Sequence, residues 1–408
     1  MSTATLQIEK KKTLVPQLRF QEFDGEWDEI KLGKLAEKIG DGLHGTPIYS
    51  ENSDINFING NNLTNGKIEI TEKTKKVDYS IFKKNDKSLN ENTILISLNG
   101  TIGNIAKYND EKVMLGKSVG YFNFKENRDF YFHVFHTDKI QNFFISELTG
   151  STIKNLSLKT LRETIFPFPT LPEQQKIANF LNTVDKKIQQ LTRKTALLEQ
   201  YKKGVMQQLF SYEIRIVKDG KLRRGCLGDF GFFYYGKGAP KTSIFKDAQT
   251  PCVRYGELYS TYKEEIKKIK SYTNINPKDL KLSKGGEVLV PRVGEDPRDF
   301  ANCSYLPFPN VAIGEMISVY NTDEDGLFMT YYINAMLKKQ LAKLVEGGNV
   351  SNLYFRYVET IEIEIPSKEE QQKIANFLSG IDSKIEKVKQ QLAQTQKFKK
   401  GLLQQMFV

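Results

Sequence analysis

The chain has 408 residues, of which 39% are hydrophobic and 27% are charged, with a formal net charge of +11. This composition can form hydrophobic cores and has room for two or three domains, so wholesale disorder is excluded. The three cysteines, Cys226, Cys252 and Cys303, show no Cys-x-x-Cys spacing, which argues against a zinc finger or a disulfide framework and favours the cytoplasm. The N-terminal stretch lacks a signal-peptide core and no run approaches roughly 18 apolar residues, so we expect neither secretion nor a membrane span.

The positive charge is unevenly distributed along the chain. Residues 1–19 and the stretches 171–210 and 368–408 each carry about +3 to +4, whereas the two large segments between them are close to neutral. A basic balance is typical of proteins that bind nucleic acid, but charge runs on helices are about as often solvated faces. The net charge therefore suggests nucleic acid as a partner without locating a binding site.

Residues 1–15 form a basic tail, and residues 16–169 have the pattern of a mixed α/β domain. Short strands are predicted at 57–59, 67–70 and 93–97, where β-branched residues stand between Gly and Asn. A helix is predicted over 130–148. The loops that follow the strands are rich in Gly and Asn and could face a ligand.

Residues 170–211 are predicted to form one long helix. Thr170 and Glu173 have the spacing of a capping box, in which the two side chains satisfy free amides of the first turn, and Ser367 and Glu370 have the same spacing farther along the chain. Apolar residues then recur at alternating spacings of four and three, which is the seam of a coiled coil on a helix about 48 Å long. The predicted seam consists of Ile177, Leu181, Val184, Ile188, Leu191 and Leu198.

The same helix returns at residues 367–408, after a second mixed α/β block at residues 212–366. The segment from Glu173 to Leu181 is repeated without change from Glu370 to Leu378, and the match continues without a gap to the helix end. Chance cannot account for this match, so the chain contains a duplication. Because the second block must lead the chain back, we expect the two helices to pair antiparallel. The second seam consists of Ile374, Leu378, Ile381, Ile385, Val388 and Leu392.

The duplication extends more faintly through the two blocks. Leu18-Arg19-Phe20 corresponds to Ile214-Arg215-Ile216, and the strand run 94–96 corresponds to 288–290. The blocks have diverged far more than the helices, which suggests one framework that carries two different binding surfaces. We therefore predict an α+β fold of two pseudo-symmetric mixed α/β domains separated by an antiparallel two-helix coiled-coil spacer.

Signatures of catalysis are missing from the sequence. There is no Gly-x-x-x-x-Gly-Lys-Ser/Thr loop for ATP, and Gly236-x-Gly238 is only a weak match to a methyltransferase cofactor loop. His133 and His136 lie three residues apart without a third ligand nearby, so we expect core or surface histidines and no metal. No catalytic residue is predicted, and we expect the chain to catalyse nothing alone.

Several motifs at the helix ends and at the start of the chain resemble motifs of one and the same protein family. They are the repeated Glu-Gln-Gln-Lys-Ile-Ala-Asn-Phe-Leu, the helix ends Lys-Lys-Gly-x-x-Gln-Gln-x-Phe, the opening Pro16–Phe20 with Asp24–Trp27, and Asn99–Gly103. Together these segments, which cover essentially the whole chain, resemble the specificity subunit of type I restriction–modification enzymes. The second block departs from the family pattern, with Arg292–Arg298 in place of the Asn-Gly-Thr-Ile-Gly loop.

The resemblance implies that residues 16–169 and 212–366 are target recognition domains, each recognising one half of a bipartite, asymmetric DNA site. It implies that the helices act as a spacer and dock two methyltransferase subunits, through which restriction/translocase subunits join. S-adenosylmethionine, ATP and Mg²⁺ would then belong to the partner subunits, with no cofactor in this chain.

Base recognition requires polar or cationic side chains on loops, while contacts to phosphates fix the register. Two other interpretations stay open: a coiled-coil protein adaptor that binds no DNA, and a stand-alone DNA-modifying enzyme. The adaptor would lack salt-dependent DNA affinity in the assembled complex. The candidate DNA-binding residues are His44, Thr46, Asn61, Asn62, Asn99 and Thr101 in the first block and Lys237, Lys241, Arg254, Arg292 and Arg298 in the second.

Overall fold

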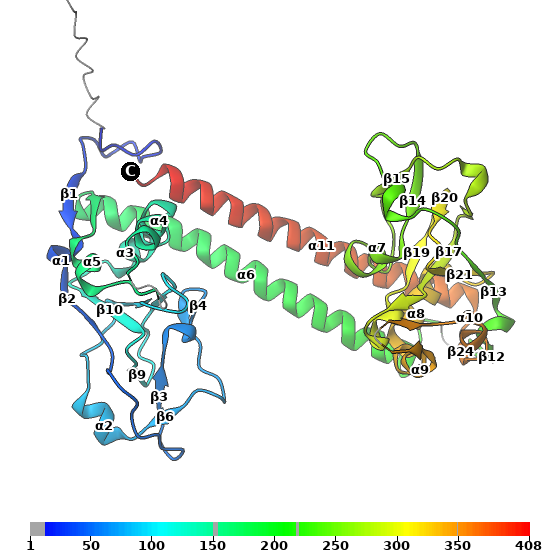
Figure 1. Ribbon diagram of the computed structural model, residues 1–408, viewed down its shortest axis with the longest axis horizontal. Helices are drawn as coiled ribbons and strands as arrows, with labels where there is room; N and C mark the ends of the chain where they lie inside the picture. Colours follow the sequence, from blue (N-terminus) through cyan, green and yellow to red (C-terminus); the bar gives the residue numbers. More distant parts are fainter. Residues whose placement is uncertain (1–12, 150–153, 218–219, 349) are drawn as a thin grey trace, which may run out of the picture. The chain divides into compact units, whose positions relative to one another are not determined.

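The computed structural model describes residues 13–149, 154–217, 220–348 and 350–408. It consists of two compact units, one formed by Met1–Thr192 with Gln390–Val408 (unit 1) and the other by Arg193–Lys389 (unit 2). Each unit contains one α/β block and a part of each long helix, α6 (Leu171–Phe210) and α11 (Lys368–Gln405) (Figure 1). Because one part of each long helix packs in unit 1 and the other part in unit 2, neither helix forms a domain of its own.

The block of unit 1 is built on two small sheets and two strand pairs. The four-stranded antiparallel sheet has the order β2-β10-β7-β8, and the second sheet has the order β6-β3-β9 with β3 and β9 parallel. β1 pairs with β11, and β4 with β5. The strands are β1 (Asp28–Lys31), β2 (Ala36–Asp41), β3 (Ile55–Ile58), β4 (Leu63–Thr64), β5 (Lys67–Ile68), β6 (Lys76–Val77), β7 (Thr93–Ser97), β8 (Ile105–Lys107), β9 (Val113–Leu115), β10 (Val119–Phe124) and β11 (Ile165–Phe168). The short helices are α1 (Leu32–Leu35), α2 (Tyr79–Lys84), α3 (Arg128–Phe135), α4 (Asp138–Ser146) and α5 (Leu158–Glu163).

The block of unit 2 repeats the main sheets of unit 1 with additions, a fourth strand in its second sheet and a three-stranded sheet of the order β18-β23-β22. Its antiparallel sheet has the order β13-β21-β17-β19, its second sheet has the order β15-β14-β20-β16 with β14 and β20 parallel, and β12 pairs with β24. The strands are β12 (Arg223–Cys226), β13 (Gly231–Tyr235), β14 (Thr250–Val253), β15 (Ser271–Thr273), β16 (Leu282–Lys284), β17 (Glu287–Pro291), β18 (Val293–Gly294), β19 (Ser304–Leu306), β20 (Pro309–Ile313), β21 (Ile317–Thr322), β22 (Glu346–Gly347), β23 (Ser351–Asn352) and β24 (Glu362–Ile365). The short helices are α7 (Tyr255–Ser260), α8 (Gly326–Met336), α9 (Lys338–Leu344) and α10 (Phe355–Val358).

The helix predicted over 130–148 is two helices, α3 and α4, and its counterpart in unit 2 is likewise split into α8 and α9. The break in unit 1 falls at Thr137, whose hydroxyl accepts a hydrogen bond from the Ile140 amide and caps α4. A threonine in this role starts a new helix and ends the continuous one. Because the apolar pattern continues without interruption through residues 130–148, this break could not be predicted from the sequence.

In each unit the long helices pack against the sheet and against each other. The core of unit 1 joins Phe122 of β10, Leu181 of α6 and Leu402 of α11, and Asp185 of α6 forms an ion pair with Lys399 of α11. The core of unit 2 joins Tyr320 of β21 and Leu378 of α11 to the end of α6 at Phe210. The two helices therefore run antiparallel within each unit.

Most residues of the two predicted coiled-coil seams are buried in these contacts between the helices and the sheets. Ile188, Leu198 and Leu392 are half-buried, and Ile188 and Leu198 pack against the cores of unit 1 and unit 2, respectively. The remaining seam residues are at most 9% exposed: Ile177, Leu181, Val184, Leu191, Ile374, Leu378, Ile381, Ile385 and Val388.

The glutamates of the two predicted capping boxes have a different role in the structure. The buried carboxylate of Glu173 accepts two hydrogen bonds of 2.8 Å from Arg19, and that of Glu370 accepts bonds of 2.9 and 2.6 Å from Arg215. A buried carboxylate is stabilised far more by a bidentate guanidinium than by one backbone amide, which explains why the box prediction is wrong. These pairs fasten the segment that precedes each block to the start of a long helix. The Ser367 hydroxyl keeps its capping bond, accepting from the Glu370 amide at 3.4 Å.

Among the helices of the described residues, none combines the length and the apolar character needed to cross a membrane.

Candidate nucleic-acid interface

In unit 1, strands β2, β3, β7 and β9 all end at one edge of the two sheets. Val119 at the start of β10 pairs with Ser97 at the end of β7, and Ile58 at the end of β3 pairs with Leu115 at the end of β9. The segments that follow these ends are therefore neighbours. They are Gly42–Thr46, Asn59–Asn62, Leu98–Asn104 and Gly116–Ser118, which we call the first strand-end cluster.

Backbone hydrogen bonds hold the segment after β2 in this cluster. The Gly42 amide donates to the Val119 carbonyl at 3.1 Å, and the Leu43 amide donates to the Leu115 carbonyl at 2.7 Å. A Cβ atom on Gly42 would lie 2.2 Å from the Leu115 oxygen, so only glycine permits this approach. The chain after Gly42 is thereby fixed beside the turn between β9 and β10.

Side-chain hydroxyls join the other segments of the first strand-end cluster. Thr101 Oγ1 donates to the Gly60 carbonyl at 2.8 Å, which links the loop after β7 to the loop after β3. Ser118 Oγ accepts from the Gly60 amide at 2.9 Å and donates to Asn59 Oδ1 at 3.0 Å. The loops are therefore cross-linked and preorganised.

The sequence-predicted residues of the first block all lie in this cluster. His44, Thr46 and Asn61 are exposed, and His44 Nε2 lies 2.8 Å from Asp41 Oδ2. These three side chains are accessible to a ligand.

Three other predicted residues also belong to the loop framework. Asn62 Oδ1 accepts from the Asn59 amide and Asn62 Nδ2 donates to the Glu69 carbonyl, both at 2.9 Å. The Thr101 hydroxyl is already used, and Asn99 is half-buried and forms a β-bridge with Asn155. The amide of Asn62 and the hydroxyl of Thr101 therefore fix loop shape.

Lys117, which was not predicted from the sequence, is exposed at the tip of the turn between β9 and β10. It lies in the middle of the first strand-end cluster and is a cation suited to phosphate contact. Its only signal in the sequence is a Gly-Lys-Ser turn between two buried strands.

Unit 2 contains the same backbone arrangement. The Gly236 amide donates to the Ile317 carbonyl at 3.0 Å, and the Lys237 amide donates to the Ile313 carbonyl at 2.9 Å. A Cβ atom on Gly236 would lie 2.1 Å from the Gly314 oxygen. Gly236–Lys241, Arg254, Arg292–Arg298 and Gly314–Met316 form the second strand-end cluster.

The predicted cations of unit 2 differ in their surroundings. Lys237 and Lys241 are exposed after β13, and half-buried Arg254 immediately precedes α7. Exposed Arg298 forms an ion pair of 2.6 Å with Asp296, and its hydrogen bonds lower the pKa of Asp296 to about 2. Arg298 is therefore partly neutralised before any ligand binds.

Arg292 is held by aromatic rings. Its guanidinium carbon lies 4.2 Å from the Tyr235 ring centroid and 5.9 Å from that of Tyr354. Both tyrosines were missed by the sequence analysis, because only the fold brings β13 and the segment before α10 to the end of β17.

The backbone framework identifies equivalent positions that carry different side chains. The Leu98 amide donates to the Ser118 carbonyl at 2.9 Å, and the Arg292 amide donates to the Met316 carbonyl at 3.1 Å. A buried leucine in unit 1 thus corresponds to an arginine in unit 2, and the residues before these carbonyls are Lys117 and Glu315. The framework is common, whereas the surface chemistry is specific to each unit.

His133 of α3 lies in the core of unit 1, and His136, which follows α3, is half-buried. His133 is fully buried, and its Nε2 lies 3.0 Å from Asn182 Oδ1 on α6. His136 Nδ1 lies 2.7 Å from the Phe132 carbonyl. Within residues that the structure describes, no group of three or more His, Cys, Asp or Glu side chains is placed to hold a metal ion.

Comparison with known proteins gives a consistent result. The family model described as type I restriction modification DNA specificity domain matches residues 24–200 and again residues 223–396. The type I restriction enzyme MjaIX specificity subunit of Methanocaldococcus jannaschii is 24% identical over 410 residues, covering 93% of this chain and 92% of that protein. The crystal structure of the type I restriction-modification S subunit from M. genitalium aligns with a TM-score of 0.61 at 16% identity, over 97% of this chain and 99% of the other. A chain from a structural study of complex assembly and conformational transition of the type I R-M system aligns with a TM-score of 0.54 at 17% identity, over 93% and 96%.

Two copies of one α/β domain with paired long helices, each with a strand-end cluster, define a two-domain recognition protein. The chain belongs to the type I restriction modification DNA specificity family, which matches well over half of its length. It is a DNA-recognising specificity subunit with two recognition domains, and the predicted fold class is confirmed. Membership in this non-catalytic family decides against both the protein adaptor and the stand-alone enzyme.

Proposed function

We propose that the two strand-end clusters each contact one half of a bipartite, asymmetric DNA target. We further propose that the long helices bind two methyltransferase subunits, which in turn recruit the ATP-dependent restriction/translocase subunits. S-adenosylmethionine, ATP and Mg²⁺ would bind in those partners, and the complex would act in the cytoplasm, where its DNA is. Support for this assignment of cofactors comes from the sequence, which lacks the phosphate loop that ATP binding would need.

One observation carries the proposal for DNA: the two clusters share a backbone framework and differ in their side chains. Gly42 and Gly236 make equivalent backbone bonds, while Leu98 and Arg292, or Lys117 and Glu315, occupy equivalent positions. A framework that is kept while its polar surface changes is what recognition of two different half-sites requires. A single palindromic target would favour equal surfaces in both units.

Support for two identical partners comes from apolar side chains that are exposed in both copies of the repeat. Phe180 in unit 1 is 36% exposed, and its repeat counterpart Phe377 in unit 2 is 42% exposed. Phe398 in unit 1 and its counterpart Tyr201 in unit 2 are 55% and 52% exposed. Aromatic residues are enriched at protein–protein interfaces, and an equal pair of exposed aromatics in each unit fits one partner per unit.

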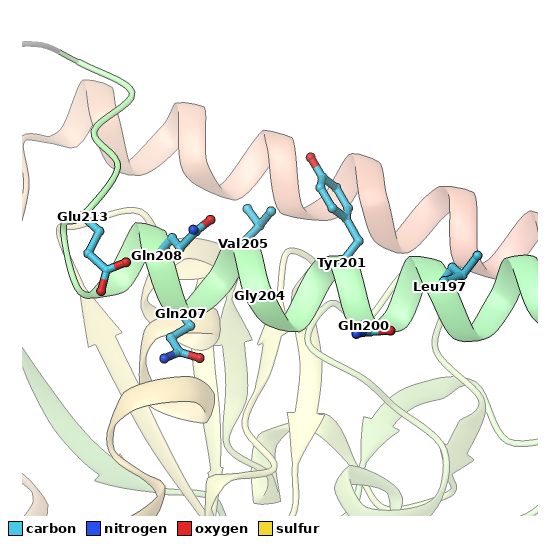
Figure 2. A pocket seen from close by; sticks show the side chains of 8 residues that line it. All are labelled: Leu197, Gln200, Tyr201, Gly204, Val205, Gln207, Gln208 and Glu213. Atoms are coloured by element: carbon cyan, nitrogen blue, oxygen red, sulfur yellow. The ribbon is translucent and has the colours of Figure 1, made fainter.

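In unit 2 this surface includes a shallow groove on α6. Leu197, Tyr201 and Val205 line it together with the neighbouring glutamines and Glu213 from the turn after the helix (Figure 2). Gly204 lies between Tyr201 and Val205 with open space beside its Cα, so a partner helix could approach the backbone closely there. Gly401, its counterpart in unit 1, is equally open.

The test for DNA recognition is an exchange of residues 16–169 for the equivalent block of another specificity subunit. The hybrid, assembled with its methyltransferase subunits, is expected to methylate a site in which one half is new and the other half is unchanged. Sequencing that detects methylated bases provides the measurement. A site changed in both halves, or methylation without sequence preference, contradicts the proposal.

The test for the docking surface replaces the exposed aromatics by glutamate. Tyr201→Glu and Phe398→Glu are expected to remove one methyltransferase subunit each, and the double variant both, as measured by mass in solution. Phe245→Glu is the matched control, because Phe245 is 52% exposed but has no aromatic counterpart in the repeat. Full assembly of the double variant would contradict the docking proposal and leave the DNA proposal intact.

A further inference from the structure

We propose that Arg292 is a specificity-determining residue that recognises a guanine in the half-site contacted by unit 2. The inference rests on the proposed function of the second strand-end cluster and deepens it by assigning a base to one residue. It depends on the geometry of Arg292, on its lack of a charged partner and on its counterpart in unit 1.

Arg292 is placed at the centre of the second strand-end cluster by its backbone. Its amide donates to the Met316 carbonyl at 3.1 Å, and its carbonyl accepts from the Leu353 amide at 2.8 Å. It follows β17 directly, so the end of the central sheet fixes its position. A residue bonded on both sides in this way cannot move with a flexible loop.

The Arg292 guanidinium is oriented without use of its donors. Tyr235 lies on one side at 4.2 Å and Tyr354 is 5.9 Å away, so cation–π contacts hold the group. Tyr235 is itself in contact with Phe355, with ring centroids 4.5 Å apart, which supports the aromatic surface from behind. Within the described ranges, no carboxylate lies within ion-pair distance of Arg292, and its buried Nε has no hydrogen-bond partner.

The fold does not require a cation at this position. Leu98, the equivalent residue of unit 1, makes the same two backbone bonds and buries an apolar side chain, being 3% exposed. A guanidinium without a carboxylate partner adds nothing to the fold that the leucine lacks, whereas a ligand that accepts hydrogen bonds from its terminal nitrogens would supply the missing partner. The arginine is therefore explained by binding and not by folding.

A guanine edge fits this arrangement better than a phosphate. Guanine presents O6 and N7 side by side in the major groove, and the planar fork of arginine is the commonest group that binds them. A phosphate does not need a fixed guanidinium plane, and exposed cations such as Lys237 and Lys241 are suited to that contact. The half-buried arginine is thus the base contact, and the exposed lysines fix the register.

The experiment compares wild type, Arg292→Lys and Arg292→Leu in the full complex with methyltransferase subunits. Leucine reproduces the residue of unit 1 and should fold, and lysine keeps the charge but loses the fork. Both variants should assemble, keep the half-site of unit 1, and lose preference for one G·C pair in the other half by about 5- to 150-fold. Arg224→Lys is the control, since Arg224 is exposed, paired with Glu364 at 2.8 Å and lies on β12, outside the second strand-end cluster; it should leave the target unchanged.

The half-site of unit 2 is identified as the half that stays unchanged when residues 16–169 are exchanged. A wild-type half-site without G·C pairs, or unchanged base preference in Arg292→Lys and Arg292→Leu, overturns the inference. So does a uniform loss of affinity with a salt slope reduced by about one, which would indicate a phosphate contact. In each of these cases the bipartite target, and with it the proposed function, can still hold.

Discussion

Asp185 Oδ1 lies 2.6 Å from Lys399 Nζ, and this ion pair joins α6 to α11 in unit 1. The duplication generates its equivalent in unit 2, where Asp382 Oδ1 lies 2.7 Å from Lys202 Nζ. In unit 1 His133 Nδ1 lies 4.0 Å from Asp185, and in unit 2 the hydroxyl of Tyr331 donates to Asp382 at 2.5 Å. In each unit, therefore, a side chain of the α/β block contacts the aspartate whose ion pair joins the two long helices.

Reversal of one charge in this pair should destabilise unit 1. Asp185→Lys places two cations side by side in a partly buried contact and should cost about 1–3 kcal/mol of unfolding free energy. Asp185→Lys combined with Lys399→Asp restores opposite charges and should recover at least about 1 kcal/mol, measured as the coupling in a double-mutant cycle. The exposed, 3.8 Å pair of Asp138 and Lys400 is the control, and its reversal should change stability by less than about 0.5 kcal/mol.

The buried histidine of this network predicts a pH dependence. Burial, together with the nearby charge of Lys399, lowers the pKa of His133 to about 4, although Asp185 partly opposes this. The unfolded chain takes up the proton near the ordinary pKa of 6.5 and the folded chain does not. Stability is therefore full above about pH 6.5 and falls, by up to about 3 kcal/mol, as the pH decreases towards 4.

His133→Gln should flatten this part of the pH profile, measured by chemical denaturation between pH 4 and 7. Thr46→Gln is the control, because Thr46 is exposed and carries no titratable group, so this variant should keep the wild-type profile. Equal slopes for the wild type and His133→Gln would show that other groups account for the loss, among them the acidic side chains and His136, whose pKa is also lowered by burial.

The helices and the duplication could be predicted because they depend on local pattern and repetition. The order of the strands could not, since pairs such as β2 with β10 join distant segments and the strands are too short to carry a register signal. The same limit applies to the site. Asn61 and Asn62 are identical and adjacent in sequence, yet Asn61 is exposed while both ends of the Asn62 amide are bonded inside the loop. Which of the two is accessible is decided by tertiary hydrogen bonds.

The length of α6 predicts the gap between the two half-sites. The helix is continuous from Leu171 to Phe210, and four residues inserted after Gln190 would lengthen it by about 6 Å. The gap should then change by about one to two base pairs, with the bases of each half unchanged, as mapped by methylation-sensitive sequencing. Altered bases within a half-site and an unchanged gap would show that the helix does not set the spacing.

The repeat also predicts that the chain tolerates circular permutation. The Leu18 amide donates to the Gln405 carbonyl at 2.9 Å, just as the Ile214 amide donates to the Gln208 carbonyl at 3.2 Å. The end of α11 therefore meets the start of the first block as the end of α6 meets the start of the second.

Val408 lies in the same core as Leu14, so a short linker from Val408 to Thr13 closes the chain without disturbing that core. A protein opened in the loop between Ser211 and Glu213 should assemble with methyltransferase subunits and methylate the original site. A protein opened inside α6 after Lys187 is the control, and it should fail because the cut divides the helix that packs in unit 1. The prediction is contradicted if the loop-opened protein folds and binds methyltransferase but methylates a different site. In that case the covalent order of the two blocks contributes to target recognition, and closeness of the chain ends is not sufficient to preserve it.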